Sequence, residues 1–322
     1  MVTMEEDSGE DQQDLRLTSM PRIALTAAIA SVLALTTAAP APASQLIPSP
    51  AAAIHDEPPI YYNGCHSWPP RTDPRACTFT HPRSKRTAML FGDSHAAHWF
   101  GAVRGVSRNQ GWRFLSLTKS SCPAADVYVR RYRVSTFHSS CRPWRKNVFG
   151  KFRRGGYGKV DVIVMSSWHF HQVTSRAYGP VTRGQRRAEL WRKGMNRTLK
   201  VLTRNAGQII VLRDSPQLPG GMRGYWSCIA RNQSTPRRCG TSTNKALSAK
   251  LWRVEKQVAA KYPTVQTIDL STPFCKGGFC SPVDGRHLAF KDDNHFNQTY
   301  MQWHFQPLLR PLMKRAMREA KA

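Results

Sequence analysis

Acidic residues are scarce in this sequence. Its 322 residues contain 20 Asp and Glu against 48 Lys and Arg, which gives a formal net charge of +28. Residues 1–43 hold six of the acids and two of the bases, so the remainder carries 46 bases against 14 acids, a net charge of +32. Such a surface attracts anionic wall polymers, lipid head groups or nucleic acid, and it equally serves solubility alone. The bases are scattered through apolar segments, which is not typical of a nucleic-acid module, so no specific nucleic-acid partner is expected.

Long hydrophobic runs are missing, with one exception. Residues 23–39 form an uncharged stretch that follows Arg22 and leads to Ala41-Pro42-Ala43. A basic flank, a short apolar run and a small-x-small site predict an export signal. The run is also near the lower length limit for a membrane-spanning helix, so an uncleaved anchor is the alternative.

The composition divides the chain into three parts. Residues 1–43 are an N-terminal extension with a signal peptide or membrane anchor, residues 44–60 form a Pro/Ala-rich linker, and residues 61–322 form the folded domain. We therefore expect an extracytoplasmic protein, either secreted or anchored to the outer face of the cytoplasmic membrane. Contact with the membrane is expected only through that anchor.

Cysteine is absent from the first 60 residues, and no C-x-x-C occurs anywhere. An even number of cysteines in an exported chain indicates disulfides, and a zinc site is the weaker alternative. Eight cysteines allow about 105 connectivities, of which local pairing is the simplest. No metal and no cofactor is expected. The local pairs would be Cys65/Cys77, Cys122/Cys141, Cys228/Cys239 and Cys275/Cys280.

Short apolar runs alternate with helical patterns from about residue 65 onward. Runs of this kind, buried on both faces, are typical of a parallel sheet, and the alternation predicts a three-layer α/β/α sandwich with a mainly parallel, flavodoxin-like sheet of about five strands. The expected strands are 87–91, 113–117, 160–166, 208–212 and 265–270. Expected helix faces are Leu247/Leu251/Val254/Val258 and Trp191/Met195/Leu199/Leu202, and a C-terminal helix from Gln298 should bend or break near Pro307 and Pro311.

The chemistry of the chain is indicated by two motifs about 200 residues apart. Gly92-Asp93-Ser94-His95 follows the first expected strand, and Asp292-Asp293-Asn294-His295 precedes the last helical segment. A serine hydroxyl is a poor nucleophile until an imidazole takes its proton and a carboxylate orients that imidazole. Because functional residues gather at the carboxyl ends of parallel strands, we expect Ser94, His295 and Asp292 to meet at one sheet edge, with Asp293 as the alternative carboxylate.

Other local signals are weaker. Ser116-x-x-Lys119 matches a penicillin-binding signature, but its partner motifs are missing and Ser116 falls within an expected strand. A G-x-S-x-G elbow is also missing around Ser94. His169-x-His171 could hold a metal, although such a pair is more typical of a surface or loop. The tryptophans are expected in the core for the most part, with Trp168 close to the site; they are Trp99, Trp112, Trp144 and Trp168.

The two motifs resemble those of the SGNH (GDSL-like) hydrolase superfamily. The nearer resemblance is to the SGNH domain associated with acyltransferase-3-type membrane acyltransferases in bacterial envelope O-acylation, and it extends over roughly residues 60–305. The residues that carry it are 90–96, 117–123, 161–168, 279–282 and Asp292-x-x-His295. The resemblance implies an SGNH hydrolase-like domain with local disulfides, one of them at Cys275/Cys280.

The resemblance also assigns roles. It implies that Ser94 is the nucleophile, His295 the general base and Asp292 the residue that orients it. Asp93 would hold the turn by accepting backbone amides, His95 would be structural, and the backbone amide of Ser94 would bind the oxyanion.

Two blocks depart from the family pattern at the remaining oxyanion donors. Residues 118–121 stand where the family has a glycine, and residues 166–168 stand where it has an asparagine. Ser121 and Ser167 are the candidates that this leaves. Loss of one oxyanion donor costs roughly 10²–10³ in rate, so these positions bear on activity.

The resemblance implies an exported serine-dependent O-acyltransferase, transferring acetyl or another short acyl group, or an esterase, acting on cell-envelope glycans through an acyl-serine. The acceptor would be an envelope polysaccharide or peptidoglycan. With at most one membrane segment in the sequence, the donor would be a separate membrane acyltransferase. The alternative is a catalytically inactive SGNH-fold protein that binds the cell envelope.

Overall fold

The computed structural model describes residues 45–130 and 136–320. Its centre is a seven-stranded sheet in which six strands run parallel in the order β1-β4-β3-β6-β8-β10, and one further strand, β2, pairs antiparallel with β4. The five expected strands are all present, and the sheet is larger than expected by β1 and β2. The strands are β1 (His66–Ser67), β2 (Cys77–Thr80), β3 (Thr87–Gly92), β4 (Arg113–Lys119), β6 (Val160–Ser166), β8 (Ala206–Leu212) and β10 (Val265–Ile268).

The central strands are buried on both faces because their apolar runs have no polar alternation. In β3, Ala88 and Leu90 belong to one core cluster, while Met89 and Phe91 belong to the other. Burial of each large apolar side chain contributes roughly 1.5–3 kcal/mol, so helices must cover both sides. The predicted α/β/α sandwich is confirmed.

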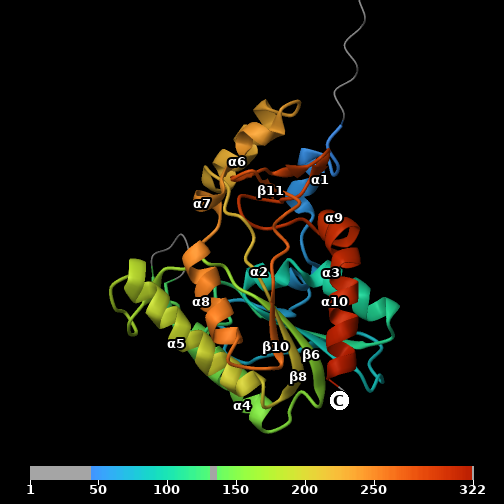
Figure 1. Ribbon diagram of the computed structural model, residues 1–322, viewed down its shortest axis with the longest axis vertical. Helices are drawn as coiled ribbons and strands as arrows, with labels where there is room; N and C mark the ends of the chain where they lie inside the picture. The colour runs from blue at the N-terminus through green and yellow to red at the C-terminus, as the bar shows by residue number, and fades with distance from the viewer. Residues whose placement is uncertain (1–44, 131–135, 321–322) are drawn as a thin grey trace, which may run out of the picture. The chain divides into compact units, whose positions relative to one another are not determined.

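Two helical layers enclose the sheet (Figure 1). α3 (Phe100–Asn109) and α10 (Gln306–Glu319) pack on one face, and α4 (Cys141–Arg153), α5 (Gly184–Leu202) and α8 (Ala249–Ala259) pack on the other. The predicted face of α5 is buried in full. In α8 the helix begins at Ala249, capped by Ser248, so Leu247 lies before it in a small separate cluster.

Short elements gather beyond the carboxyl ends of the strands, in the upper part of Figure 1. They arise from the connections after β8 and β10 and from the N-terminal segment. The helices are α1 (Pro50–His55), η1 (Pro59–Tyr61), α6 (Gly221–Arg231), η2 (Pro236–Cys239) and α7 (Thr243–Ala246). The short helix α2 (Ser94–Ala97) lies lower, directly after β3. The strands are β9 (Thr241–Ser242), β11 (Cys275–Lys276), β12 (Phe279–Cys280), β13 (Val283–Asp284) and β14 (His287–Leu288), and a further pair, β5 (Tyr128–Val129) with β7 (Val173–Thr174), lies elsewhere in the chain.

The segment predicted as a linker packs onto the domain wherever it is described. Ala53 and Ile60 are fully buried in the core, and the backbone of Ile47 bonds to Arg286 and Leu288. Leu46, Ala53 and Ile60 bury apolar area that an extended spacer would leave in water. Residues 45–60 are therefore part of the folded unit. The predicted signal or anchor in residues 1–43 lies outside the described residues.

The C-terminal helix differs in detail from its prediction. α9 (Gln298–Tyr300) continues into a π-helical turn, η3 (Met301–Phe305), directly before α10, and Pro307 lies in the first turn of α10. Pro311 lies inside α10 without ending it. Both prolines are exposed, so water can satisfy the carbonyl that Pro311 leaves without its partner. Within residues 45–130 and 136–320, no helix has the length and apolar character needed to cross a bilayer.

The four local disulfides are present as predicted. They join Cys65 to Cys77, Cys122 to Cys141, Cys228 to Cys239 and Cys275 to Cys280. Each disulfide typically stabilises a protein by roughly 2–4 kcal/mol by restricting the unfolded chain.

Candidate active site

Ser94 lies at the carboxyl end of β3, where the chain turns into α2. Gly92 has φ 145°, and a Cβ at this position would lie 2.2 Å from the carbonyl oxygen of Ser166 on β6. Glycine is therefore required for this close approach of the two strand ends. Asp93 caps α2 because its Oδ1 accepts a hydrogen bond from the His95 amide at 2.8 Å. The turn thereby presents Ser94 at the sheet edge.

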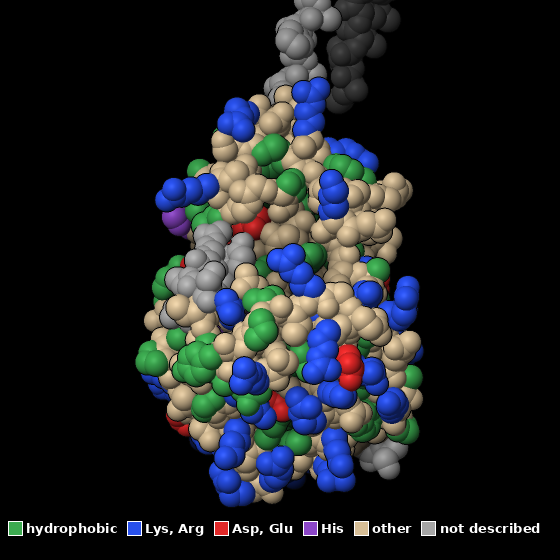
Figure 2. Space-filling view, turned by 90° about the vertical axis from the view of Figure 1, so that its left-hand side faces the viewer, with side chains coloured by type: hydrophobic (Ala, Val, Ile, Leu, Met, Phe, Trp, Pro, Cys, Tyr) green, Lys and Arg blue, Asp and Glu red, His purple; other side chains and the backbone are tan. Residues whose placement is uncertain are grey.

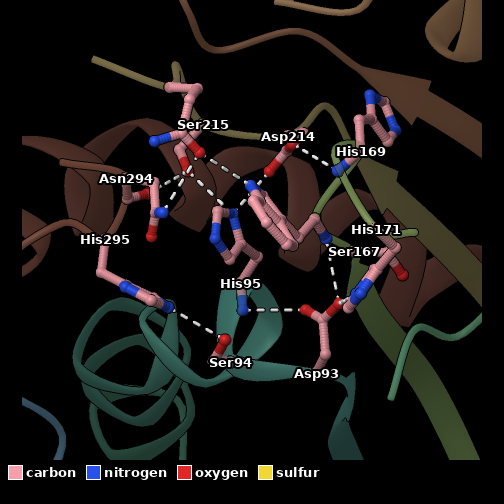
Figure 3. Close-up of polar contacts among 12 residues, drawn as sticks. Asp93, Ser94, His95, Ser167, His169, His171, Asp214, Ser215, Asn294 and His295 are labelled. Atoms are coloured by element: carbon pink, nitrogen blue, oxygen red, sulfur yellow. Dashed lines mark hydrogen bonds and ion pairs between the residues drawn. The ribbon is translucent and has the colours of Figure 1, made fainter. Parts of the chain in front are cut away.

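Ser94, His295 and Asp292 form a continuous hydrogen-bonded chain. The Ser94 hydroxyl donates to His295 Nε2 at 2.9 Å, as Figure 3 shows, and His295 Nδ1 lies 2.9 Å from Asp292 Oδ2. This network assigns the proton of the neutral imidazole to Nδ1 and leaves Nε2 to accept the serine proton. The two motifs, 201 residues apart, thus meet at one sheet edge as expected.

The three-residue spacing of Asp292 and His295 has a local cause. Asp292 Oδ1 accepts the backbone amides of Asn294 at 2.9 Å and of His295 at 2.8 Å, so the carboxylate folds the loop that carries its own imidazole. Asp293 points elsewhere and accepts from Gln217 Nε2 at 2.6 Å. Of the two adjacent carboxylates, Asp292 is the one in contact with His295.

Asp93 lies next to Ser94 in the turn and is fully buried. Its Oδ2 accepts the Trp168 amide at 3.0 Å and His171 Nε2 at 2.6 Å. Burial alone would raise the pKa of Asp93, but the bond and charge of His171 outweigh it and lower that pKa to about 2. The prediction that Asp93 holds the turn by accepting backbone amides is confirmed.

His95 faces a second buried carboxylate, that of Asp214. Its Nδ1 lies 2.6 Å from Asp214 Oδ1 and 3.0 Å from the Ser215 hydroxyl (Figure 3). Burial would lower the pKa of His95, but Asp214 outweighs this and raises it. The imidazole of His295 lies 4.7 Å away, centroid to centroid. His95 therefore supports the wall of the site through Asp214.

The His169-x-His171 pair lies in the loop after β6, one of the two settings expected from its sequence, but it is buried there and not on the surface. Both rings are buried: His171 bonds to Asp93, and His169 Nε2 lies 3.1 Å from Glu255 Oε2. The two rings therefore face different carboxylates on different elements. In the described part of the chain, no group of three His, Cys, Asp or Glu side chains is placed to hold a metal ion.

A cavity of about 470 Å³ opens above Ser94 and His295. Aromatic rings form much of its wall, and Tyr62 and Trp68 at its rim are 77% and 48% exposed, so solvent reaches the site. A volume of this size is typical of small-molecule sites. The other lining residues are Glu57, Tyr61, His95, Ser120, Ser121, Trp168, His171, Met222, Lys291, Asp292, Asp293 and Asn294.

The two candidate oxyanion serines have different surroundings. Ser121 lines the cavity and has φ 54°, a left-handed conformation that glycine adopts more readily than serine. Ser167 does not line the cavity, and its hydroxyl accepts the Ala124 amide at 2.9 Å. Ser167 thus anchors the loop that carries Ser121 instead of facing the substrate space.

The remaining local signals have structural explanations. Ser116 and Lys119 both lie within β4, and Lys119 Nζ donates to the Arg71 carbonyl at 2.6 Å. All four tryptophans singled out in the sequence are buried, and of these only Trp168 lines the cavity.

Sequence reasoning missed several residues of the site. Lys291 bonds to Glu57 at 2.7 Å and lies 3.5 Å from Asp292, which ties the N-terminal segment to the catalytic loop. Burial alone would lower the pKa of Lys291, but the charges of Asp292 and Glu57 outweigh burial, so the pKa of Lys291 is raised. The position of Lys291 directly before Asp292 was its only signal. Asp214, Ser215 and Gln217 carried none, because no motif surrounds them.

Comparison with known proteins agrees with the fold and the motifs. A family profile described as "SGNH domain (fused to AT3 domains)" matches residues 64–309. No curated protein sequence matches the chain.

Several solved structures are similar. The periplasmic domain of lipopolysaccharide acetyltransferase from Salmonella ser. Paratyphi A has a TM-score of 0.54 at 14% identity, covering 79% of this chain and 93% of that one. A carbohydrate esterase family 2 enzyme with its carbohydrate binding domain, from Corynascus thermopiles (Myceliophthora fergusii), has a TM-score of 0.39 at 12% identity, covering 73% and 67%. The acetyl xylan esterase Est2A from Butyrivibrio proteoclasticus has a TM-score of 0.34 at 10% identity, covering 71% of this chain and 64% of that one.

The first similarity shows a shared fold, and the family profile spans most of the chain. The protein therefore belongs to the SGNH domain family that is described as fused to AT3 domains.

Proposed function

We propose that this protein is a serine-dependent acyl-transfer enzyme in which Ser94 is the nucleophile, His295 the general base and Asp292 the residue that orients it. The observation that carries this proposal is the pair of contacts, 2.9 Å each, that link Ser94 Oγ to His295 Nε2 and His295 Nδ1 to Asp292 at the floor of a cavity. A hydroxyl in such a chain loses its proton to the imidazole as it attacks, and the buried carboxylate stabilises the resulting imidazolium.

The reaction proceeds in two steps, acylation of Ser94 and deacylation of the acyl-serine. Ser94 Oγ forms a bond to the acyl carbonyl carbon while its proton passes to His295 Nε2; the tetrahedral intermediate then expels the donor alcohol or thiol, which takes that proton. In the second half, His295 removes a proton from a glycan hydroxyl or from water, the new oxygen attacks the acyl-serine, and Ser94 Oγ leaves with the proton. The first acceptor gives transfer, and water gives hydrolysis.

The oxyanion requires donors that are fixed before the reaction begins. We propose the backbone amides of Ser94 and Ser121, because Ser121 lines the cavity and has a left-handed backbone of the kind that glycine favours. The Ser167 hydroxyl does not face the cavity, since it accepts the Ala124 amide, and it is not proposed as an oxyanion donor.

The substrate we propose is an acetyl or other short acyl group and a cell-envelope glycan, an envelope polysaccharide or peptidoglycan. The aromatic wall formed by Tyr61, Trp68 and Trp168 suits the apolar faces of sugar rings, and the solved relative of similar fold is a domain of a lipopolysaccharide acetyltransferase. A separate membrane acyltransferase would supply the acyl group. The protein would act outside the cytoplasm, secreted or anchored, and its four disulfides support an oxidising compartment.

The decisive experiment uses p-nitrophenyl acetate and a serine-directed fluorophosphonate. We expect the protein to release p-nitrophenol, and we expect Ser94→Ala to lower that rate by at least ~10³ because the residual catalysis then lacks a nucleophile. Ser116→Ala is the matched control, since Ser116 is buried in β4 away from the cavity. Mass spectrometry should find the fluorophosphonate on Ser94.

Full activity of Ser94→Ala, or label on another residue, would overturn the assignment. A protein that binds envelope glycan equally well with and without Ser94, and shows no turnover of any ester, would instead be an inactive binding protein of the same fold.

A further inference from the structure

The two helical layers of this protein differ in charge. α4, α5 and α8 together contain 14 Lys and Arg and two Glu. α3 and α10 together contain six Lys and Arg and one Glu. Both Glu of the first layer are engaged: Glu189 pairs with Arg186 and Lys193, and Glu255 is buried against Trp191 and His169. Figure 2 shows this side of the molecule, where blue basic side chains far outnumber red acidic ones.

Two adjoining hollows lie along α4 and α5 on this side. They measure about 340 and 860 Å³ and share the lining residues Asp126, Phe149 and Arg153. Five further bases line them: Arg142, Lys146, Arg197, Lys200 and Arg204. We call the two hollows together the α4–α5 groove.

The one acid of the α4–α5 groove is already neutralised. Asp126 lies 3.3 Å from the buried guanidinium of Arg145 and 2.8 Å from that of Arg197. Burial would raise the pKa of Asp126, but these guanidinium groups outweigh it and lower it. Across the described residues, four groove bases form no ion pair: Lys146, Arg153, Lys200 and Arg204.

The α4–α5 groove is close to the cavity along the chain. Ser121 lines the cavity and Asp126 lines the groove, and five residues of extended chain span at most about 18 Å. The disulfide from Cys122 to Cys141, the first residue of α4, holds the two sites together. The Asp126 end of the groove is therefore the end near the cavity, and the groove leads from there toward the ends of α4 and α5, where Arg153, Lys200 and Arg204 lie.

We propose that the α4–α5 groove binds a negatively charged glycan chain. Unpaired Lys and Arg offer charged donors to carboxylate or phosphate groups on the sugars, and the rings of Tyr128, Phe137 and Phe149 offer apolar surface between them. The proposal rests on the proposed function only for the purpose of binding, which is to anchor the acceptor polymer on the protein that carries Ser94. Binding itself requires no reaction, so the two are tested separately.

The test measures binding of polygalacturonate, a linear polymer of sugar carboxylates, with neutral dextran of equal length for comparison. The groove variant combines Lys146→Gln, Arg153→Gln, Lys200→Gln and Arg204→Gln. The control variant removes the same charge from exposed positions of α10, on the opposite face of the sheet, by Arg310→Gln, Lys314→Gln, Arg315→Gln and Arg318→Gln. Melting temperature and near-UV circular dichroism confirm that both variants fold.

We expect the groove variant to bind polygalacturonate at least about tenfold more weakly, because each exposed charge pair contributes a few-fold, and the control variant to bind within about threefold of the parent. Dextran should not bind.

Equal weakening in the two variants would show diffuse attraction to net charge and would overturn the proposal. Tighter binding of duplex DNA or of phosphatidylglycerol vesicles than of polygalacturonate, lost in the same groove variant, would also overturn it and identify a different partner. Hydrolysis of p-nitrophenyl acetate is read independently, so loss of binding and absence of catalysis are distinguishable.

Discussion

Asp292 and Asp293 are adjacent in the chain, yet their surroundings drive their ionisation in opposite directions. Burial would raise the pKa of Asp292, but the charge and hydrogen bond of His295, with help from Lys291, hold it well below its usual range. For Asp293, burial and the neighbouring charge of Asp292 raise the pKa. A carboxylate that stays ionised is the one suited to stabilise an imidazolium.

Substitution of each carboxylate by its amide should separate their roles. Asp292→Asn leaves the shape intact but offers an amide donor to His295 Nδ1, which favours the wrong tautomer, so kcat should fall by about 10³–10⁴. Asp293→Asn keeps an acceptor for Gln217 and should change kcat by less than about tenfold. Steady-state hydrolysis of p-nitrophenyl acetate measures both. Equal losses in the two variants would contradict the assignment of Asp292.

Ser121 has a backbone conformation that glycine favours, within the block that departs from the family pattern. A non-glycine residue in the left-handed region costs roughly 1–2 kcal/mol, and Ser121 has φ 54°. Arg145 fixes the adjoining segment, since its Nη1 donates to the Pro123 carbonyl at 2.8 Å and its Nη2 to the Val127 carbonyl at 2.7 Å. These contacts hold the segment next to Ser121 in place.

At the scale of elements, the ends of β3 and β6 are tied together by one buried carboxylate. Asp93, directly after β3, accepts the amide of Trp168 and the ring N–H of His171, both in the loop after β6. A second link joins α2 to the end of β8 through His95 and Asp214. Three neighbouring strands of the sheet therefore position Ser94, and its place at the sheet edge does not depend on its own turn alone.

The Asp93 link predicts a specific acid sensitivity. Because the pKa of Asp93 falls from 3.8 to about 2 on folding, its contribution is complete above about pH 5 and is lost progressively as the pH falls toward about 1, mostly between pH 4 and pH 2. The shift corresponds to roughly 2 kcal/mol of unfolding free energy. Urea unfolding should therefore show a smaller decline between pH 4 and pH 2 in Asp93→Asn than in the parent, by about that amount.

A matched variant separates this effect from general acid unfolding. Asp73→Asn removes a carboxylate that is 72% exposed and whose pair with Lys151 contributes little, so its decline should equal that of the parent. An Asp93→Asn variant that loses stability between pH 4 and pH 2 as steeply as the parent would show that the carboxylate is not a source of acid sensitivity.

At the scale of the whole molecule, the dominant feature is a formal net charge of +28. Like charges repel one another in the compact state, and salt screens that repulsion over a Debye length of about 30 Å at 0.01 M and about 8 Å at 0.15 M.

Salt should stabilise this protein. Raising NaCl from about 0.01 M to about 0.15 M screens repulsion among the surface bases and should raise Tm by a few degrees, as followed by circular dichroism. The groove variant with four fewer charges should gain less. A Tm that falls with salt would show that attractive surface pairs, and not repulsion, dominate the electrostatics.

The sequence by itself determined what depends on local pattern. Apolar runs buried on both faces identified the five central strands, close spacing identified the four disulfides, and two short motifs identified Ser94, Asp292 and His295 as residues that would meet. These features are visible because period and spacing act over a few residues, and because strand ends of a parallel sheet share one edge.

Only the tertiary structure decided which distant groups become partners. His171 is 78 residues from Asp93 and His95 is 119 residues from Asp214, and neither pair has a motif that links it. The same holds for residues 45–60, whose composition is that of a spacer but whose apolar side chains find a core to cover. Burial and ion pairing depend on what surrounds a residue in three dimensions, and a linear pattern does not contain that information.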